Sequence, residues 1–452
     1  MRLQETLQQS LRSEIEKHQK QNSYTLLKLS ELSGINQGHL SDIIRNNRPM
    51  TIGQLDALAK TFGKPPGWLY ELYTEECFVN ERVSRPRVIP YLIRCAEIGL
   101  HDCIQQTVSR LLEHRKNVDI LFSVAEQLFE SGKHKESVPF YNLVIENEKD
   151  CHTDRFAISQ YRLFRALQGI DAEENWKAVI RFEPYRNRLP ESYQLDGLLH
   201  LRKACFMLQK WKEVEKYADE LRALAMRVYQ EELRKRKSGK PFEPLKTERH
   251  LVVYYGQGFL AKGVALQMQG LYEEAKKYIQ GYADLDWFEL LDDVGRREVE
   301  RFKLWAKANL YTCDLLLGQT HILDEYLDFL EKNPDELRAG LLTVMEAACK
   351  YDIDIDHVLE RYSKEMRRFC EHQDQVNITR FINFCYYKAE YELKKGGINQ
   401  ALKEILCCLN LADRLKDHQA FKRCAALFWE LRHHATEQHE RVYHKLLRRL
   451  SE

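Results

Sequence analysis

The feature that most restricts the fold is a turn signal that returns at long and similar intervals after residue 90. The turns fall at Gly132, Gly169, Gln209, Gly270, Gly318 and Gly396. The first two steps, of 37 and 40 residues, match one repeat of about 34 to 40 residues. The last step, of 78 residues, matches two repeats with a degenerate unit near residue 350. This period predicts pairs of helices that stack and bury a continuous core between neighbours.

The clearest repeat is GQGFLAKGVALQMQGLYEEAKKYIQGYADL, residues 256–285. Gly263 is a small residue in its first helix, Gly270 makes the turn, and Tyr272 and Ala275 begin its second helix. The unit resembles the tetratricopeptide repeat, in which small residues let paired helices approach and an aromatic side chain fills the gap between pairs. The same pattern recurs in residues 118–150 and 381–412. The resemblance implies a right-handed tetratricopeptide-like α-solenoid over residues 93–452.

The composition favours an all-α chain. Only 20 glycines and 11 prolines occur in 452 residues, and no strand-like alternation persists beyond residue 90. Such scarcity is typical of long helices joined by short turns. The long step between Gln209 and Gly270 contains a basic, proline-containing insertion at residues 234–250, which we expect to form a loop.

The sequence predicts a cytoplasmic protein without a membrane partner. It contains no run of about 18 apolar residues, which a membrane-spanning helix needs. The first twenty residues carry frequent charges and lack the apolar segment of a signal peptide. The 12 cysteines are scattered, with Cys407 and Cys408 the only close pair. This pattern is typical of thiols in a reducing compartment and argues against disulfides or a zinc site.

Near the N-terminus, helical periodicity is broken by a glycine. Leu26, Leu29 and Leu32 recur at three-residue spacing and predict a short amphipathic helix over residues 25–33. Gly34 ends this helix, because glycine tolerates the positive φ of a helix terminus.

A second short helix follows. Asn36 is a good N-cap, and Leu40, Ile43 and Ile44 form its expected buried face. Pro49 ends the unit, and a further amphipathic helix over residues 52–62 closes over it. The outer face of the second helix is polar, which is unusual for a helix whose only task is packing.

This arrangement resembles the Xre/Cro family of helix-turn-helix DNA-binding domains, over residues 3–72. The positions in register with that family are Ser30, Gly34, Ile35, Asn36, Leu40, Ser41, Ile43, Arg48 and Pro49. The resemblance places the second helix, from its cap at Asn36, in the DNA major groove. It implies base contacts from Gln37, Gly38, His39 and Asp42. It also implies that five residues lie near phosphates: Thr25, Ser41, Arg45, Asn47 and Arg48.

The charge of this segment predicts a homodimer. Residues 1–80 contain nine Lys and Arg and nine Asp and Glu, so a single copy is neutral and should bind DNA weakly. We therefore expect two copies on palindromic double-stranded DNA, with half-sites about 34 Å apart. Residues 76–92, which contain three arginines, are expected to be a linker between a DNA-binding domain at 1–75 and a repeat domain at 93–452.

Stacked helix pairs have a concave surface lined by their first helices, and such surfaces bind extended peptides. Amide side chains pair with a peptide backbone, while Tyr and Trp offer apolar area with a polar tip. The candidates for peptide contact are Gln257, Gln267, Trp305, Asn309, Thr312, Asn383, Tyr386 and Glu390. For each of them, packing between repeats is an equally good interpretation.

The sequence contains no recognisable catalytic or metal-binding pattern. The motifs HExxH, GxSxG and the phosphate-binding loop are absent. The GxG of residues 256–258 lies inside a predicted repeat helix without a preceding strand, so a dinucleotide site is excluded by context. The C-terminal histidines have no pair at the spacing of four that a helical metal site uses. We therefore expect no enzymatic activity, no cofactor and no metal.

An Xre-type domain joined to tetratricopeptide-like repeats resembles the RRNPP group of cytosolic quorum-sensing regulators. The likeness covers the whole chain in architecture, but only the first seventy residues by motif. It implies a dimeric transcription regulator that binds operator DNA and is switched by a short signalling peptide in the concave face. Three alternatives stay open: a helical cap with a solvated polar face, a repeat adaptor that does not bind DNA, and a regulator of an enzyme partner.

Overall fold

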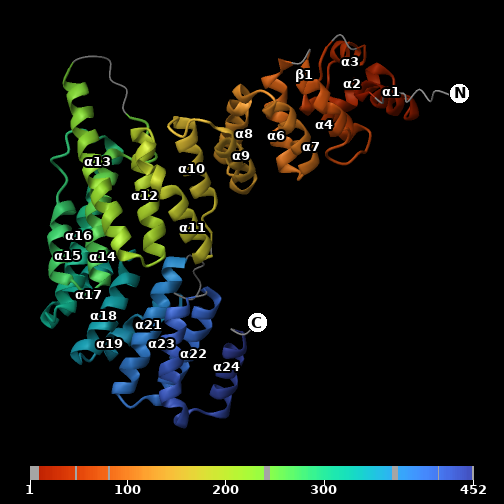
Figure 1. The fold of residues 1–452 in the computed structure, drawn as a ribbon. Helices are drawn as coiled ribbons and strands as arrows, with labels where there is room; N and C mark the ends of the chain where they lie inside the picture. The colour runs from red at the N-terminus through yellow and green to blue at the C-terminus, as the bar shows by residue number, and fades with distance from the viewer. Residues whose placement is uncertain are drawn as a thin grey trace. The chain divides into compact units, whose positions relative to one another are not determined.

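The computed structural model describes residues 10–45, 48–79, 82–169, 171–238, 245–368, 375–415 and 417–449. Over these ranges the chain is α-helical, apart from one short antiparallel hairpin, as the composition predicts. The chain divides into two compact units, Met1–Pro190 and Glu191–Glu452 (Figure 1). None of the described helices is long and apolar enough to cross a lipid bilayer.

The first unit opens with short helices and continues with longer ones that pack in sequence order. Its elements are α1 (Leu11–Gln21), α2 (Leu26–Ser33), α3 (Gln37–Ile44), α4 (Ile52–Thr61), α5 (Tyr70–Tyr73), η1 (Thr74–Cys77), β1 (Phe78–Val79), β2 (Arg82–Val83), α6 (Arg85–Glu97), α7 (His101–Leu112), η2 (Arg115–Asn117), α8 (Val118–Glu130), α9 (His134–Asn147), α10 (Asp154–Ala166), α11 (Ala172–Phe182) and η3 (Glu183–Arg188).

One hydrophobic core joins the N-terminal helices to α6, α7, α8 and α9. Tyr73 and Tyr91 are buried in it, and both phenols find backbone acceptors. The Tyr73 hydroxyl donates to the Met50 carbonyl (2.9 Å), and the Tyr91 hydroxyl donates to the Tyr70 carbonyl (2.8 Å). Because buried hydroxyls need partners, these bonds fix where α5 and α6 sit against the loop before α4.

The described residues of the segment 76–92 contribute to this core and do not form the separate linker that the sequence predicts. Phe78 pairs with Val83 in the hairpin, and α6 already begins at Arg85. The buried Glu76 accepts hydrogen bonds from the Arg12 guanidinium (2.6 Å) and from the backbone N–H of Met50 (3.2 Å). These partners lie in α1 and in the loop before α4, so no local sequence pattern reveals them.

A second set of polar contacts joins α4 to α6. Asp56 of α4 accepts hydrogen bonds from the Tyr70 hydroxyl (2.6 Å) and from Nε of Arg94 (3.0 Å). The same arginine donates to Glu97 (2.9 Å), which also pairs with Lys133. Burial would raise the pKa of Glu97, but hydrogen bonds from Lys133 and Arg94 outweigh this effect and lower it.

The second unit consists of helices that pack against their neighbours in sequence, as Figure 1 shows for α13 to α16 and for α21 to α23. Its elements are α12 (Glu191–Met207), α13 (Trp211–Lys237), α14 (Leu251–Met268), α15 (Tyr272–Ala283), α16 (Asp293–Leu316), η4 (Thr320–Ile322), α17 (Leu323–Lys332), α18 (Leu337–Tyr351), α19 (Asp356–Arg361), α20 (Ser363–Arg368), α21 (Gln375–Lys394), α22 (Ile398–Leu415), α23 (His418–Leu431), η6 (Arg432–His434) and α24 (Glu437–Arg449).

Five of the six predicted repeat turns have the left-handed backbone that glycine favours. Their φ angles are +80° at Gly132, +54° at Gln209, +77° at Gly270, +94° at Gly318 and +80° at Gly396. Each of these residues lies between two consecutive helices, so these turn predictions are confirmed. The exception is Gly169, which lies before α11 and does not have a positive φ. The degenerate unit expected near residue 350 contains a sixth such turn, at Asp352 (φ +56°).

Small residues bring paired helices close together in the second unit. A Cβ on Gly258 would lie 2.9 Å from the Ala218 carbonyl oxygen, so α14 approaches the backbone of α13 closely. Gly263 faces α15, where a Cβ would meet the Ala275 carbonyl oxygen at 3.6 Å, and Ala275 is fully buried. The small residues of the predicted repeat therefore lie at the helix contact expected of them.

The basic insertion is only partly a loop, which corrects the prediction for residues 234–250. Helix α13 continues to Lys237, because Arg and Lys are good helix formers and complement the negative C-terminal end of a helix. After residues 239–244, which lie outside the described ranges, the backbone N–H of Leu245 donates to the buried Glu232 (3.2 Å).

Candidate functional site

The candidate DNA-binding surface is built by α2, the turn at Gly34 and α3. The Thr25 hydroxyl caps α2 by accepting from the backbone N–H of Lys28 (3.2 Å). Gly34 ends the helix at φ +70°, and its N–H donates to the Ser30 carbonyl (2.9 Å). No described atom lies within 4 Å of a Cβ built on Gly34, so the backbone angle rather than lack of space favours glycine.

Asn36 caps α3 as the sequence predicts. Its side-chain oxygen accepts from the N–H groups of Gly38 (2.9 Å) and His39 (3.4 Å), which would otherwise lack partners at the start of the helix. Leu40 and Ile43 are fully buried beneath the helix. The cap is thus confirmed, and so are two of the three residues predicted for the apolar back of α3, because Ile44 is only half-buried.

The apolar face predicted for α2 is only partly correct. Leu29 is fully buried, but Leu32 is 48% exposed and Leu27 is 57% exposed. Each three-residue step falls about 60° short of a full helical turn, so residues repeated at this spacing drift off the buried face. Two exposed leucines therefore lie on α2.

The predicted DNA contacts lie on the solvent side of these two helices. Exposed residues among them are Thr25, Asn36, Gln37, Gly38, Asp42, Arg45 and Arg48, while His39 and Ser41 are half-buried. Asn47 lies outside the described residues. The helix thus presents amide, imidazole and carboxylate groups to solvent from one short segment, and these groups hydrogen-bond to base edges.

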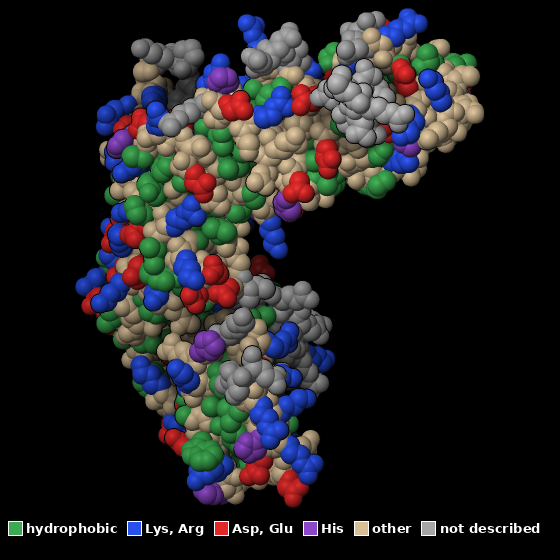
Figure 2. All heavy atoms as spheres, turned by 45° about the vertical axis from the view of Figure 1, so that its right-hand side comes forward, with side chains coloured by type: hydrophobic (Ala, Val, Ile, Leu, Met, Phe, Trp, Pro, Cys, Tyr) green, Lys and Arg blue, Asp and Glu red, His purple; other side chains and the backbone are tan. Residues whose placement is uncertain are grey.

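Two cations beside α3 stay available for a ligand. Among the residues that the structure describes, neither Arg45 nor Arg48 has an ion-pair partner. Lys28 and Glu31 pair at 3.4 Å on the exposed side of α2, a contact that contributes little in water. Over the face drawn in Figure 2, basic and acidic side chains are interspersed, so no large single-sign patch is visible there.

Arg12 supports α3 from behind. Its Nε donates to the Ile43 carbonyl (2.9 Å), at the C-terminal end of α3, while its Nη1 pairs with Glu76 (2.6 Å). A cation at this end complements the helix dipole and adds a donor to a carbonyl of the last helical turn. The polar face of α3 is therefore held by Asn36 at one end and by Arg12 at the other.

In the second unit, three predicted peptide contacts are engaged by neighbouring helices. The Gln267 amide donates to the Asn309 carbonyl (3.2 Å), and the Asn309 amide donates to the Tyr282 hydroxyl (2.9 Å). The Thr312 hydroxyl lies 3.3 Å from that of Tyr326. These bonds connect α14, α15, α16 and α17, as expected if the three residues pack between repeats.

Two further candidates, Gln257 and Trp305, are half-buried. The Trp305 ring stands edge-on to Phe302, with 5.5 Å between centroids, and its indole donates to Glu336. Burial raises the pKa of Glu336, and the indole hydrogen bond moderates this rise.

The remaining three candidates, Asn383, Tyr386 and Glu390, lie together on α21 with a partner that sequence reasoning missed. Arg423 of α23 donates from Nη2 to the Asn383 side-chain oxygen (2.9 Å), and its Cζ lies 3.8 Å from the Tyr386 ring centroid. Tyr386 in turn donates to Glu390. The Arg423 Nε is buried without an acceptor among the described residues. No local pattern points to Arg423, because its partners lie about one repeat earlier in the chain.

Glu346 of α18 adds a half-buried carboxyl near this group. It accepts hydrogen bonds from the hydroxyls of Tyr272 (3.4 Å) and Tyr387. Burial raises the pKa of Glu346, although Arg423 and Lys350 lie close enough to oppose the rise. The resulting cluster combines two cations, Arg423 and Lys350, two carboxyls, Glu346 and Glu390, and several phenols.

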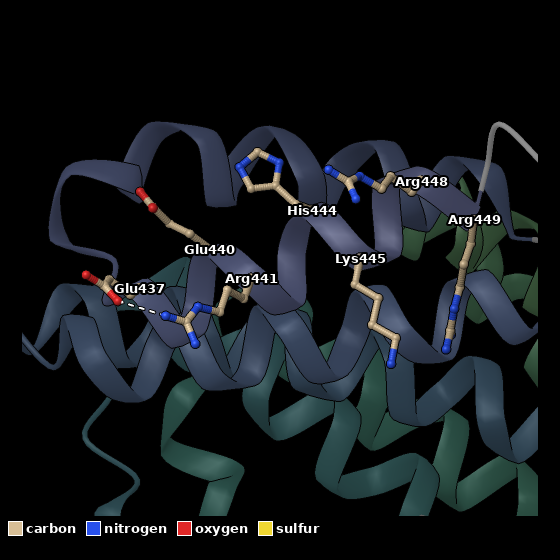
Figure 3. Close-up of a pocket in the computed structure, with 7 residues that line it drawn as sticks. All are labelled: Glu437, Glu440, Arg441, His444, Lys445, Arg448 and Arg449. Carbon is tan, nitrogen blue, oxygen red and sulfur yellow. Dashed lines mark hydrogen bonds and ion pairs between the residues drawn. The ribbon is translucent and has the colours of Figure 1, made fainter.

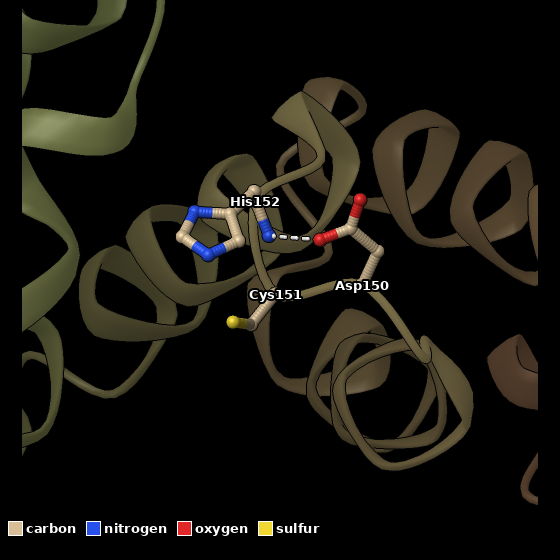
Figure 4. A group of neighbouring side chains, drawn as sticks. All are labelled: Asp150, Cys151 and His152. Carbon is tan, nitrogen blue, oxygen red and sulfur yellow. Dashed lines mark hydrogen bonds between the residues drawn. The ribbon is translucent and has the colours of Figure 1, made fainter.

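Two other polar groups form no enclosed site. A hollow on α24 is lined by residues of that helix alone, with Arg441 paired to Glu437 at 3.0 Å (Figure 3). Asp150, Cys151 and His152 place their ligand atoms within 4.8 Å of one another, but they are adjacent, exposed residues of one turn (Figure 4). Metal ligands are normally oriented by further hydrogen-bond partners. The carboxylate of Asp150 instead accepts from the His152 backbone (2.8 Å), and we assign no metal here.

No protein-family model matches the chain, and no curated protein is significantly similar to it.

Proposed function

We propose that the chain is a DNA-binding transcription regulator whose α2 and α3 form a helix-turn-helix of the Xre/Cro type. The observation that carries the proposal is the exposed polar face of α3, fixed by the Asn36 cap after a left-handed turn at Gly34. In this type of domain the N-terminal residues of the second helix reach base edges. Gln37 and His39 occupy that position, and a glutamine amide pairs well with adenine.

The proposed regulator binds as a homodimer on palindromic DNA. Residues 1–80 carry equal numbers of basic and acidic side chains, so one copy gains little from neutralising phosphates. Arg45 and Arg48 supply the phosphate contacts beside α3. Two copies on half-sites about 34 Å apart double this contribution.

The helix pairs after α6 are proposed to stack as a right-handed tetratricopeptide-like solenoid. The left-handed turns at repeat spacing and the close approach of α14 to its neighbours support this arrangement. With an Xre-type domain before it, such a chain resembles the RRNPP regulators of the cytoplasm. The proposal assigns the chain no chemical reaction and no cofactor.

A short signalling peptide is the proposed ligand, held by Arg423, Asn383 and Tyr386. The buried Nε of Arg423 has no acceptor among the residues that the structure describes, and a guanidinium in this position can bind a carbonyl or carboxylate oxygen of a peptide. To move the DNA-competent population from 1:99 to 99:1, the peptide must favour one conformation by about 5.5 kcal/mol. Several charge-assisted hydrogen bonds and one aromatic contact are sufficient for a difference of that size.

The DNA-binding part is tested by selecting binding sites from genomic fragments with the purified full-length protein. We expect a palindromic site, and the Gln37→Ala, His39→Ala double variant should lose specific affinity for it. Lys17→Ala is the matched control, because Lys17 is an exposed cation on α1 and not on α2 or α3. Circular dichroism should show unchanged helix content in all variants.

Two results would contradict this assignment. Unchanged operator affinity in the double variant would remove α3 as the reading helix. No enriched site under any condition would favour the adaptor function, and pull-downs would then identify the protein partner.

The peptide-binding part is tested with short peptides encoded beside the gene. One of them should change operator affinity or the mass measured by light scattering, and Arg423→Gln should abolish this response while basal operator affinity stays the same. Arg432→Gln is the control, since Arg432 covers Trp429 at the exposed end of the same helix. An Arg423→Gln protein that still responds would remove Arg423 from the ligand site.

A further inference from the structure

Four cysteines from three helices lie together in the second unit. Cys385 belongs to α21, Cys407 and Cys408 to α22, and Cys424 to α23, and all four are free thiols. Cys424 donates a hydrogen bond to the Cys408 sulfur at 2.8 Å, and Cys408 donates to the Ile382 carbonyl (3.4 Å). Cys385 donates to the Cys407 sulfur. The four thiols therefore form two pairs, which the scattered cysteines of the sequence do not predict.

The two pairs differ in access to solvent. Cys408 and Cys424 are completely buried, and Cys385 is 1% exposed, whereas Cys407 is partly exposed. A small oxidant in water therefore reaches Cys407 before the other three thiols.

The surroundings of Cys407 also favour its reactive form. The hydrogen bond from Cys385 lowers the pKa of the Cys407 thiol against the opposing effect of burial, and Lys388 contributes in the same direction. The pKa of Cys385 is raised, because it donates that hydrogen bond and is buried. A partly exposed thiol with a lowered pKa beside a second thiol is the arrangement found at redox-sensitive cysteines.

The register of α21 and α22 places both thiols on one contact line. Lys388 donates to Glu404 (2.6 Å). Lys388 lies three positions after Cys385 on α21, and Glu404 lies three positions before Cys407 on α22. Because consecutive helices run antiparallel, the ion pair and the thiol pair occupy successive turns of the same interface. The thiols thus meet through helix packing rather than through a flexible loop.

Small residues let α21 and α22 approach closely along this line. Ala389 and Ala401 are both fully buried in the same core. Helices in contact have axes about 8 to 10 Å apart and Cα atoms about 2.3 Å from each axis, so facing Cα atoms come within about 6 Å. That separation is compatible with the Cα distance of about 4.4 to 6.8 Å across a disulfide.

We propose that Cys385 and Cys407 form a reversible disulfide in response to a hydroperoxide. The Cys407 thiolate attacks the terminal peroxide oxygen, so that an S–O bond forms, the O–O bond breaks and the leaving oxygen takes a proton to become an alcohol or water. The Cys385 sulfur then attacks the sulfenic sulfur of Cys407, and the hydroxide that leaves takes the Cys385 proton as water. Two thiols are oxidised by two electrons, and the hydroperoxide is reduced by the same two.

The test treats the full-length protein with a small molar excess of hydrogen peroxide, blocks remaining thiols with N-ethylmaleimide and digests with trypsin without reduction. Trypsin releases Cys385 in residues 381–388, Cys407 and Cys408 in residues 404–414, and Cys424 in residues 424–432. We expect 381–388 joined to 404–414, two hydrogens lighter than the separate peptides, and released by dithiothreitol. The peptide 424–432 should carry the alkylated thiol.

Single variants identify the sulfurs. Cys385→Ser should leave a sulfenic acid on Cys407 that dimedone traps, and Cys407→Ser should abolish the cross-link. Cys408→Ser is the matched control and should keep the cross-link. A bond between 404–414 and 424–432, or modification confined to the exposed Cys151, would overturn the proposal, and the wild-type peptide map decides this even if a variant fails to fold.

Discussion

At the residue scale, the backbone angle at Gly34 links sequence to function most directly. An alanine there must adopt φ +70°, which costs about 1 kcal/mol for a residue with a Cβ. Gly34→Ala should therefore lower the free energy of unfolding by about that amount in urea denaturation. Gly53→Ala is the control, since Gly53 lies in α4 without positive φ and with no described atom within 4 Å of its Cβ. Equal losses in the free energy of unfolding for Gly34→Ala and Gly53→Ala would show that a side chain at position 34 does not strain the turn.

Glu346 makes a pH-dependent prediction. Burial raises its pKa in the folded protein, so the ionised form costs stability above the unfolded pKa of about 4.3. That cost grows as the pH rises towards the folded pKa and vanishes where both states are protonated. Glu346→Gln should therefore raise Tm at pH 7, and the gain should shrink as the pH falls towards 4. Glu274→Gln, at an exposed position on α15, should change Tm little at either pH. A lower Tm of the Glu346 variant at pH 7 would contradict the direction of the shift.

Residues whose role depends on chain neighbours were predictable from the sequence, and residues whose role depends on distant partners were not. The caps Thr25 and Asn36 act within three residues of themselves. Arg423 meets Asn383 across two helices, and Cys407 meets Cys385 in the same way. Such pairs produce no periodic signal, because only the packing of α21, α22 and α23 brings them together.

At the scale of elements, the segment expected to be a linker is the clearest failure of sequence reasoning. The sequence predicts a linker that contains three arginines, yet Val88, Tyr91 and Leu92 are fully buried in α6. Arg87 and Arg94 each donate to an acceptor in another element, the Glu76 carbonyl and the Asp56 carboxylate, and no local sequence pattern reveals these contacts. The N-terminal helices and α6 therefore share one core. The proposed reading helix, α3, packs in the same core as the helices that follow it in the first unit.

The contact between Glu76 and Arg12 allows this packing of residues 76–92 against the N-terminal helices to be tested. Only 18% of the Arg12 side chain and 10% of the Glu76 side chain are exposed, so removing one charge leaves the other largely buried. Glu76→Gln should lower the free energy of unfolding by roughly 3 kcal/mol. The adjacent Glu75 pairs with Arg110 but is 71% exposed, so Glu75→Gln should cost less than about 1 kcal/mol. Urea denaturation of both variants makes the comparison, and equal losses would show that the Arg12 contact does not anchor the segment.

At the scale of the whole molecule, the repeat period predicted helix pairs and most of their turns, but not where the chain divides. The sequence places a boundary near residue 75, whereas the compact units divide after Pro190. Turns recur in both units, so the period alone carries no sign of this division. The division depends on which helices share a core, and that depends on long-range contacts such as those of Tyr73 and Tyr91 in the first unit.

The number of copies on DNA predicts how binding responds to salt. Each proposed interface offers two cations near phosphates, Arg45 and Arg48, and the logarithm of affinity falls by about 0.9 per phosphate neutralised for each logarithmic unit of salt. A dimer should therefore give a slope of about −4, and a single copy a slope of about −2. Fluorescence anisotropy on the selected operator, between low and moderate salt, measures this slope. Arg45→Gln should reduce it by about 2 in a dimer, because the change occurs in both copies, and by about 1 in a monomer. A salt slope that fits a single copy would contradict the dimer. It would mean that cations outside residues 1–80, and not a second copy, compensate for the neutral charge of this segment.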